Sequence, residues 1–252
     1  MECDLNADLG EGFGAWRLGD DEALLEVVTS ANVACGFHAG DPTTMTRVCA
    51  AAAAAGVAVG AQVGYRDLAG FGRRRMDIAP EDLLADVLYQ IGALEACARA
   101  VGTAVRYVKP HGALYNTAAD DPTQAGAVVA AVVAYDAALP LLGLPGSELE
   151  AAATAAGLPF VAEAFADRAY TPAGRLVPRS EPHALHHTEQ AVVAQAVSIV
   201  RDRTVRTAGG DMVSVQAASL CLHGDTPGAV GLARAVRAAL TGLGVTLAPF
   251  AG

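Results

Sequence analysis

The sequence CDLNADLGEG, residues 3–12, lies near the start of the chain and alternates small or apolar residues with polar ones. Successive side chains of a β-strand point to opposite faces, so Asp4, Asn6 and Asp8 share one face of this segment. An interior face with these groups is costly unless they meet partners, water or a ligand. The segment therefore predicts a buried strand that either carries a hydrogen-bonded polar layer or leads into a functional site.

Strand-like and helix-like segments alternate outward from this strand to the end of the chain. Several of the strand-like segments are short apolar runs, which is typical of parallel strands covered by helices on both faces. This pattern forms a closed barrel or an open doubly wound sheet, and in both folds ligands bind at the carboxyl ends of the strands. We expect strands at Cys3–Asp8, Ser30–Cys35, Val57–Gln62, Val105–Lys109, Pro140–Gly143, Pro159–Phe165 and Ser219–His223.

Helix starts and one hairpin complete the expected organisation. An aspartate just before a proline at 41–42, at 121–122 and within 225–227 places an N-cap acceptor at the start of a helix. Segments 203–207 and 211–216 flank a Gly-Gly turn and predict a β-hairpin outside the parallel sheet. Because no linker, repeat or low-complexity tract interrupts the pattern, we expect one domain over residues 1–252.

Composition narrows the class of protein. Hydrophobic residues make up 53% of the 252 residues and charged residues 17%, which suits a packed core. The net charge of −10 argues against a nucleic-acid partner. Five cysteines without a CxxC pair indicate a reduced compartment. No signal-like or membrane-length apolar segment is visible, so we expect a cytoplasmic protein with no membrane partner.

The cations are distributed unevenly between the two residue types. Lys109 is the only lysine among 17 cationic residues, and it lies in the motif VKPHGALYN, residues 108–116. Lysine is a compact charge whose pKa can move, whereas arginine is planar and permanently charged. A composition that uses arginine everywhere else retains lysine at this one place, which indicates a functional role for Lys109.

Side chains that can do chemistry follow the predicted strands. Asp8 and Glu163 can act as general bases, and Lys109 can pair with a carboxylate or stabilise a developing oxyanion. An aspartate with two histidines, here Asp8, His38 and His111, is also a workable set for a divalent metal with an activated water. The strand ends gather Asp8, Asn32, His38, Lys109, His111, Glu163, Asp167, Arg168, His223 and Asp225.

An anionic ligand has one candidate clamp in the sequence. Arg73 and the two arginines after it follow the turn-forming segment 70–72. The chain contains no GxxxxGK[ST] phosphate loop and no GxGxxG placed after a strand. A nucleotide must therefore bind by another arrangement or on a partner protein.

Six segments, taken together, resemble the LamB/YcsF family. They are DLNADLGEGFG (4–14), ANVACGFHAGDP (31–42), GFGRR (70–74), VKPHGALYN (108–116), EAFADRAY (163–170) and LHGD (222–225). The resemblance implies a distorted TIM-like β/α barrel with about seven parallel strands, similar to the glycoside hydrolase and deacetylase barrels. It also implies a 5-oxoprolinase role, in which ATP-dependent hydrolysis of 5-oxo-L-proline gives L-glutamate, ADP and phosphate. The implied partners are the B and C subunits of the 5-oxoprolinase, and a homo-oligomer is compatible with this role.

The resemblance points to these site residues: Asn6, Asp8, Glu11, His38, Lys109, His111, Glu163, Asp167, Arg168 and His223. The residues themselves add Asn32, Gln62, Arg73 and Asp225. We expect Asp8, Lys109, His111 and Glu163 to be catalytic. The expected binding residues for substrate or nucleotide are Asn6, Glu11, Asn32, His38, Gln62, Arg73, Asp167, Arg168, His223 and Asp225. The family's usual Gly-Ala-His-Pro is Gly-Ala-Gln-Val at residues 60–63 here, and Gln62 is neither a general base nor a good metal ligand.

Two other functions remain open from the residues alone. One is a metal-dependent amidohydrolase or deacetylase that needs neither ATP nor partners. The other is a non-catalytic subunit that captures a ligand while a partner performs the chemistry.

Overall fold

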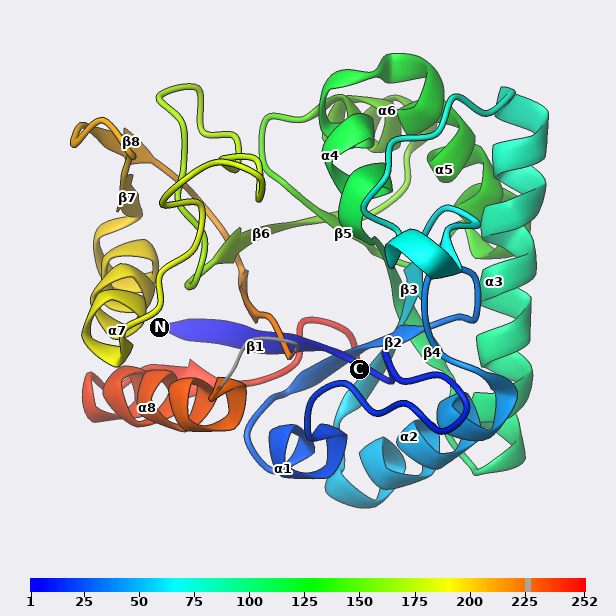
Figure 1. The fold of residues 1–252 in the computed structure, drawn as a ribbon, viewed down its shortest axis with the longest axis horizontal. Coiled ribbons are helices and arrows are strands. Elements are labelled where there is room, and N and C mark those ends of the chain that lie inside the picture. The colour runs from blue at the N-terminus through cyan, green and yellow to red at the C-terminus, as the bar shows by residue number, and fades with distance from the viewer. Residues whose placement is uncertain (225–227) are drawn as a thin grey trace.

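Seven parallel strands close into a barrel in this computed structural model, which describes residues 1–224 and 228–252 (Figure 1). The order is β1-β2-β3-β4-β5-β6-β9, and β9 pairs with β1 to close the ring. The strands are β1 (Glu2–Leu9), β2 (Ser30–Ala34), β3 (Ala58–Val63), β4 (Val105–Pro110), β5 (Leu141–Gly143), β6 (Phe160–Phe165) and β9 (Ser219–Leu222). The predicted strands are confirmed within one residue at every end.

Helices surround the barrel and cover the apolar outer face of its strands (Figure 1). They are α1 (Asp21–Leu25), α2 (Pro42–Ala55), α3 (Pro80–Ala100), α4 (Gly112–Asp120), α5 (Pro122–Asp136), α6 (Glu148–Ala156), α7 (Glu189–Val197) and α8 (Ala229–Gly242), with a 3-10 turn at Leu68–Gly70 and a π-helical turn at Ser198–Asp202. The Asp41 and Asp121 side chains cap α2 and α5 as predicted. The third predicted cap, at 225–227, lies outside the described residues. No helix among the described residues is long and apolar enough to cross a membrane.

Two small additions lie outside the ring of seven strands. The predicted hairpin is confirmed as β7 (Thr204–Arg206) paired antiparallel with β8 (Met212–Ser214). The short strand β10 (Thr246–Leu247) pairs with the start of β1 and was not predicted. Two residues are too short to carry a periodic signal, so β10 has no signature in the sequence.

The interior of the barrel is polar at the amino-terminal end of β1, opposite the cavity, as the alternation in β1 indicates. The Asp4 carboxylate accepts hydrogen bonds from Ser30 at 2.6 Å, from Thr29 at 2.6 Å, and from Ser219. Asn6 lies one layer higher and donates to Ser219 at 2.6 Å. Both predicted outcomes for this strand therefore hold: Asp4 and Asn6 form a hydrogen-bonded layer, and Asp8 above them reaches a cavity.

One glycine makes room for this polar interior. A Cβ on Gly60 of β3 would lie 2.2 Å from the ring of Tyr107 on β4. The ring crosses the barrel there, and its hydroxyl donates to Asn32 Oδ1 at 2.7 Å. Gly60 is thus required by a close approach in the barrel.

Candidate active site

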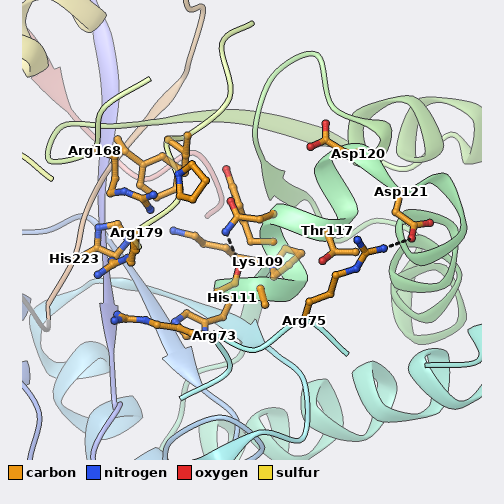
Figure 2. Close-up of a pocket in the computed structure, with 18 of the residues that line it drawn as sticks. Arg73, Arg75, Lys109, His111, Thr117, Asp120, Asp121, Arg168, Arg179 and His223 are labelled. Atoms are coloured by element: carbon orange, nitrogen blue, oxygen red, sulfur yellow. Dashed lines mark hydrogen bonds and ion pairs between the residues drawn. The ribbon is translucent and has the colours of Figure 1, made fainter. Parts of the chain in front are cut away.

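A cavity of about 890 Å³ opens at the carboxyl ends of the strands, between the barrel and the segment 166–188 (Figure 2). The predicted site residues that line it are Asp8, Arg73, Lys109, His111, Arg168 and His223. Arg75 and Arg179 line it as well, so cations outnumber the lining carboxylates of Asp8, Asp120 and Asp121 in a chain whose net charge is −10. Such an excess favours an anionic ligand.

The floor of this cavity is an ion cluster of Asp8, Lys109 and Glu163, called the lysine cluster below. Lys109 Nζ lies 3.0 Å from Glu163 Oε2 and 3.4 Å from Asp8 Oδ1. No residue of the cluster is more than 5% exposed. Burial of a lone ammonium would lower its pKa, but the two carboxylates hold the pKa of Lys109 well above its ordinary value. The two carboxylates therefore favour the charged form of Lys109.

The two carboxylates of the lysine cluster differ in their surroundings. Burial acts to raise the pKa of Asp8, yet Lys109, the nearby histidines and the Asn32 hydrogen bond (2.8 Å) together lower it. Burial dominates at Glu163 and raises its pKa. Glu163 lies behind Lys109, whereas Asp8 lines the cavity, so Asp8 is the carboxylate that a ligand meets.

Beside the lysine cluster lies a group of Glu11, His38, Gln62 and His111, called the histidine cluster. His38 Nε2 lies 3.0 Å from Gln62 Oε1, and the Gln62 amide donates to Glu11 Oε1 at 3.3 Å. The same Glu11 oxygen lies 3.5 Å from His111 Nε2. The two imidazole rings stack with centroids 4.1 Å apart.

Burial keeps the histidine cluster neutral. It lowers the pKa of His38 to about 4 and, with the charge of the neighbouring His38, lowers the pKa of His111 well below its ordinary value. The charge of Asp8 acts to raise the pKa of both histidines but does not offset this desolvation. Both rings are thus neutral imidazoles at neutral pH, able to act as bases or as metal ligands.

The ligand atoms of Glu11, His38 and His111 lie within 4.8 Å of one another. It is the one group among the described residues with three such ligand atoms together. Sequence reasoning placed Asp8 in this set, but Asp8 is bonded to Asn32 and paired with Lys109. Glu11 takes the place of Asp8, because the turn after β1 brings Glu11 beside Gln62 of β3.

The turn 70–73 closes over the histidine cluster. Gly72 has φ +66°, and a Cβ there would lie 2.8 Å from His38 Cβ and 3.0 Å from His111 Nδ1. Phe71 packs edge-on against both imidazoles. Arg73 and the next arginine diverge: Arg73 lines the cavity, whereas Arg74 pairs with Asp67. Of the three arginines, Arg73 and Arg75 line the cavity, and Arg75 also pairs with Asp121 at 3.6 Å.

The side wall of the cavity carries a histidine–aspartate pair. His223 Nδ1 lies 2.8 Å from Asp167 Oδ2, and the ring stacks on Phe165 at 5.5 Å. Burial acts to raise the pKa of Asp167, but the charge and hydrogen bonds of His223 lower it. Nδ1 is engaged by Asp167, so Nε2 is the nitrogen available to a ligand. The neighbouring predicted residue, Asp225, lies outside the described residues.

Arg168 has a structural task in addition to lining the cavity. Its guanidinium donates to the carbonyl oxygens of Val177 at 2.6 Å and Ala184 at 3.4 Å. Burial lowers the pKa of Arg168 to about 10. These bonds hold the segment 169–185 across the top of the cavity, where Arg179 also lies (Figure 2).

The lining residues that the sequence did not indicate include Tyr115, Phe165 and Arg179. Tyr115 lies four residues after His111, one helical turn further along α4, and burial together with the nearby charge of Glu163 raises the pKa of its hydroxyl well above the ordinary value. The i, i+4 spacing within the motif at 108–116 could have indicated Tyr115. Arg179 lies in an irregular segment, so no periodicity could have placed it.

The remaining predicted residues are buried beneath the cavity surface. Asn6 and Asn32 link the carboxylates to the polar layer below, with Asn32 donating to both Asn6 and Asp8. Asn6 Oδ1 also accepts from Lys109 at 3.3 Å. Their amides fix the position of the lysine cluster from below.

Fold and site together define a β/α-barrel protein with a cationic cavity over a buried lysine–carboxylate floor. The model of the LamB/YcsF family matches residues 3–252. This chain belongs to the LamB/YcsF family.

Similar proteins carry names that bear on its role. The 5-oxoprolinase A subunit of Streptomyces avermitilis is 64% identical over 98% of this chain and 99% of its own length. The protein of that name in Paracidovorax citrulli is 60% identical, with full coverage of both chains.

Solved structures agree with the fold. The crystal structure of a lactam utilization protein from Thermus thermophilus matches with a TM-score of 0.94 and 47% identity, over 99% of this chain and 100% of the other. A family 4 carbohydrate esterase from Streptomyces lividans matches with a TM-score of 0.51 at 12% identity, over 98% of this chain and 91% of the other. The second likeness extends to the fold alone.

Proposed function

We propose that this chain is the A subunit of an ATP-dependent 5-oxoprolinase, a cytoplasmic enzyme that opens 5-oxo-L-proline to L-glutamate while ATP is cleaved to ADP and phosphate. Full-length similarity to proteins named as the A subunit of 5-oxoprolinase supports the substrate and the need for partner subunits, here B and C. The observation that carries the proposal is Lys109 at the floor of the cavity, 3.0 Å from Glu163 and 3.4 Å from Asp8, with arginines around it.

The chemistry of the substrate explains a need for ATP. An unstrained five-membered lactam is a poor electrophile, and its leaving group is an amine. Transfer of a phosphoryl group to the amide oxygen makes the ring carbon open to attack by water. Water then adds to that carbon, the carbon–nitrogen bond breaks with its electron pair going to nitrogen, and the nitrogen takes up a proton. The product of this step is an acyl phosphate, and a second water displaces its phosphate to leave the glutamate carboxylate.

The cavity offers a group for each of these needs. The lactam carboxylate and a phosphorylated oxygen are anions, which Lys109 and Arg73 are positioned to receive. Asp8, an ionised carboxylate on the cavity surface, orients the attacking water. His223, held by Asp167 at 2.8 Å, delivers the proton to the leaving nitrogen.

Glu163 and His111 complete the proposed catalytic set. Glu163, 3.0 Å from Lys109 and fully buried, holds the ammonium toward the substrate. His111 lines the cavity as a neutral imidazole beside Asp8 and contributes a hydrogen-bonding wall.

Glutamate release from 5-oxoproline tests the proposal, with and without ATP, for this chain alone and then with its B and C partners. We expect release only with ATP and the complete set. Replacement of Asp167 by Asn, which leaves His223 without its carboxylate, should lower kcat about 10²-fold or more. Release by the chain alone without ATP would instead identify a metal-dependent amidohydrolase, and full activity of Lys109→Ala would exclude the role of Lys109.

A third outcome would identify a capture subunit. If substitutions at Asp8, Lys109 and His223 left turnover by the complete set unchanged, the chemistry would lie on a partner. Binding of 5-oxoproline to the isolated chain would then be its remaining role.

A further inference from the structure

The histidine cluster has more ligand atoms than the proposed lactam chemistry uses. Glu11, His38 and His111 come from three separate segments: the turn after β1, the turn after β2 and the end of β4. None of them is more than 6% exposed. The folded chain thus holds a carboxylate and two imidazoles together with little water, at a desolvation cost that a bound cation would offset.

The contact between Glu11 and His111 has the spacing of a metal site, whereas Gln62 hydrogen-bonds to His38 Nε2 and Glu11, and a bound ion would replace the bond to His38 Nε2. Glu11 Oε1 and His111 Nε2 are 3.5 Å apart, which is long for a hydrogen bond. Ligand atoms about 2.1 Å from a tetrahedral zinc ion lie about 3.4 Å from one another. The contact therefore matches an edge of such a coordination shell.

The ring orientations agree with this arrangement. Both Nε2 atoms face the Glu11–Gln62 side, as their contacts with Glu11 and Gln62 show. Both Nδ1 atoms point the other way, toward glycines, since an added Cβ on Gly64 would lie 2.6 Å from His38 Nδ1. The glycines leave the rings no room to turn away from the carboxylate.

We propose that Glu11, His38 and His111 bind one divalent transition-metal ion of the Zn²⁺ class. One carboxylate and two imidazoles suit zinc, iron or manganese, whereas magnesium and calcium prefer shells made of oxygen atoms alone. His111 also lines the cavity, so the ion is reached from the same space as the lysine cluster. The assignment does not depend on the proposed lactam hydrolysis.

Two features set the expected strength of binding. Neither His38 Nδ1 nor His111 Nδ1 has a hydrogen-bond partner among the described residues. Such outer hydrogen bonds raise metal affinity about 10–100-fold where they exist. The fourth neighbour, Gln62, offers an amide, which is a weaker ligand than imidazole. We therefore expect a dissociation constant for Zn²⁺ of about 1 μM, weaker than that of a four-ligand structural site.

The test measures metal on the isolated chain, without turnover. Metal-free protein is dialysed against about 10 μM Zn²⁺ at neutral pH, and bound metal is counted by mass spectrometry, with Mg²⁺ in a parallel dialysis. We expect one Zn²⁺ per chain and no Mg²⁺. Glu11→Gln and His111→Ala should each weaken Zn²⁺ binding about 100-fold, whereas Gln62→His, which adds an imidazole, should tighten it about 10-fold.

Two histidines outside the cluster provide matched controls. His187→Ala, at an exposed loop position, and His223→Ala, at the other wall of the cavity, should both leave the affinity unchanged within about twofold. Circular dichroism of each variant checks that it folds, and the nearly isosteric Glu11→Gln decides the question if His111→Ala does not.

Two results would overturn the assignment. The first is binding of less than about one-tenth equivalent of Zn²⁺ under the conditions above. The second is binding that Glu11→Gln and Gln62→His leave unchanged, which would place the ion at cysteines or on the surface. Either failure leaves the lactam proposal standing, because glutamate release is measured separately.

Discussion

The lysine cluster and the histidine cluster lie next to each other under one cavity, yet burial leaves side chains ionised in the first and neutral in the second. Lys109 and Gln62 are register partners on neighbouring strands, so the two groups share a wall. Both are almost wholly buried. Lys109 and Asp8 nevertheless stay ionised, whereas His38 and His111 stay neutral.

The difference lies in the number of countercharges. Lys109 has two carboxylates within 3.4 Å, and an asparagine oxygen at 3.3 Å. His111 Nε2 lies 3.5 Å from Glu11, and His38 Nε2 is bonded to the neutral amide of Gln62. The charge of Asp8 acts to raise the pKa of both rings, but burial outweighs it, and the stacked rings would repel each other if both were charged. Burial alone thus does not decide ionisation in this barrel, because the supply of partners decides whether desolvation is offset.

Removal of the central charge should have the largest effect. Lys109→Met leaves Asp8 and Glu163 buried without a cation, and we expect a loss of about 3–5 kcal/mol in the free energy of unfolding together with loss of activity. Urea unfolding and glutamate release measure the two effects. Arg106→Met, on the exposed face of the same strand, is the control and should stay within about 0.5 kcal/mol of the wild type.

The close packing of the histidine cluster gives the next largest effect. Gly72→Ala forces a side chain onto a residue with φ +66° and into contact with His38 and His111. We expect destabilisation of about 2–4 kcal/mol, part from the left-handed backbone and part from overpacking. Thermal unfolding measures it.

An exposed glycine within α3 is the matched control for that substitution. Gly92→Ala meets no atom within 4 Å and should stabilise the chain by up to about 1 kcal/mol. Equal effects of the two substitutions would show that Gly72 does not hold the histidines in place.

The lysine cluster was largely predictable from the sequence, and the histidine cluster only in part. Asp8, Lys109 and Glu163 lie on strands, where a period of two and the strand order bring their side chains into one interior. The single lysine in the chain pointed to the same place. The regular geometry of the strands therefore made this part of the site predictable from the sequence.

The histidine cluster depends on turns, which have no period. Glu11 follows β1 and His38 follows β2, each on an irregular segment shaped by glycines of positive φ such as Gly10 and Gly36. The sequence supplied the right residue types but paired Asp8, rather than Glu11, with the histidines. A turn can redirect a side chain by several ångströms, so the three-dimensional structure is needed to show which carboxylate lies beside the two histidines.

The stability that Asp8 contributes to the lysine cluster should depend on pH in the acid range. The pKa of Asp8 is lowered in the folded state, so its contribution is present above about pH 3.8 and is lost as the pH falls toward the folded value. Asp8→Asn should therefore cost about 2–3 kcal/mol at pH 7. This cost should shrink by about 1.4 kcal/mol for each pH unit below 3.8. Urea unfolding at pH 7, 5 and 3 gives the difference, and a cost that is constant across this range would contradict the ion-pair account.

The smallest effect should come from a histidine that carries no charge. His38→Gln replaces a neutral ring with a neutral amide that can still reach Gln62, so the lost terms are the stacking on His111 and the contact with Phe71. We expect a loss of about 1–2 kcal/mol in metal-free protein, measured by urea unfolding with a chelator present. Lys109→Met in the same buffer provides the comparison. If His38→Gln cost as much as Lys109→Met, the histidine cluster would be holding a charge after all, and the contrast between the two clusters would fail.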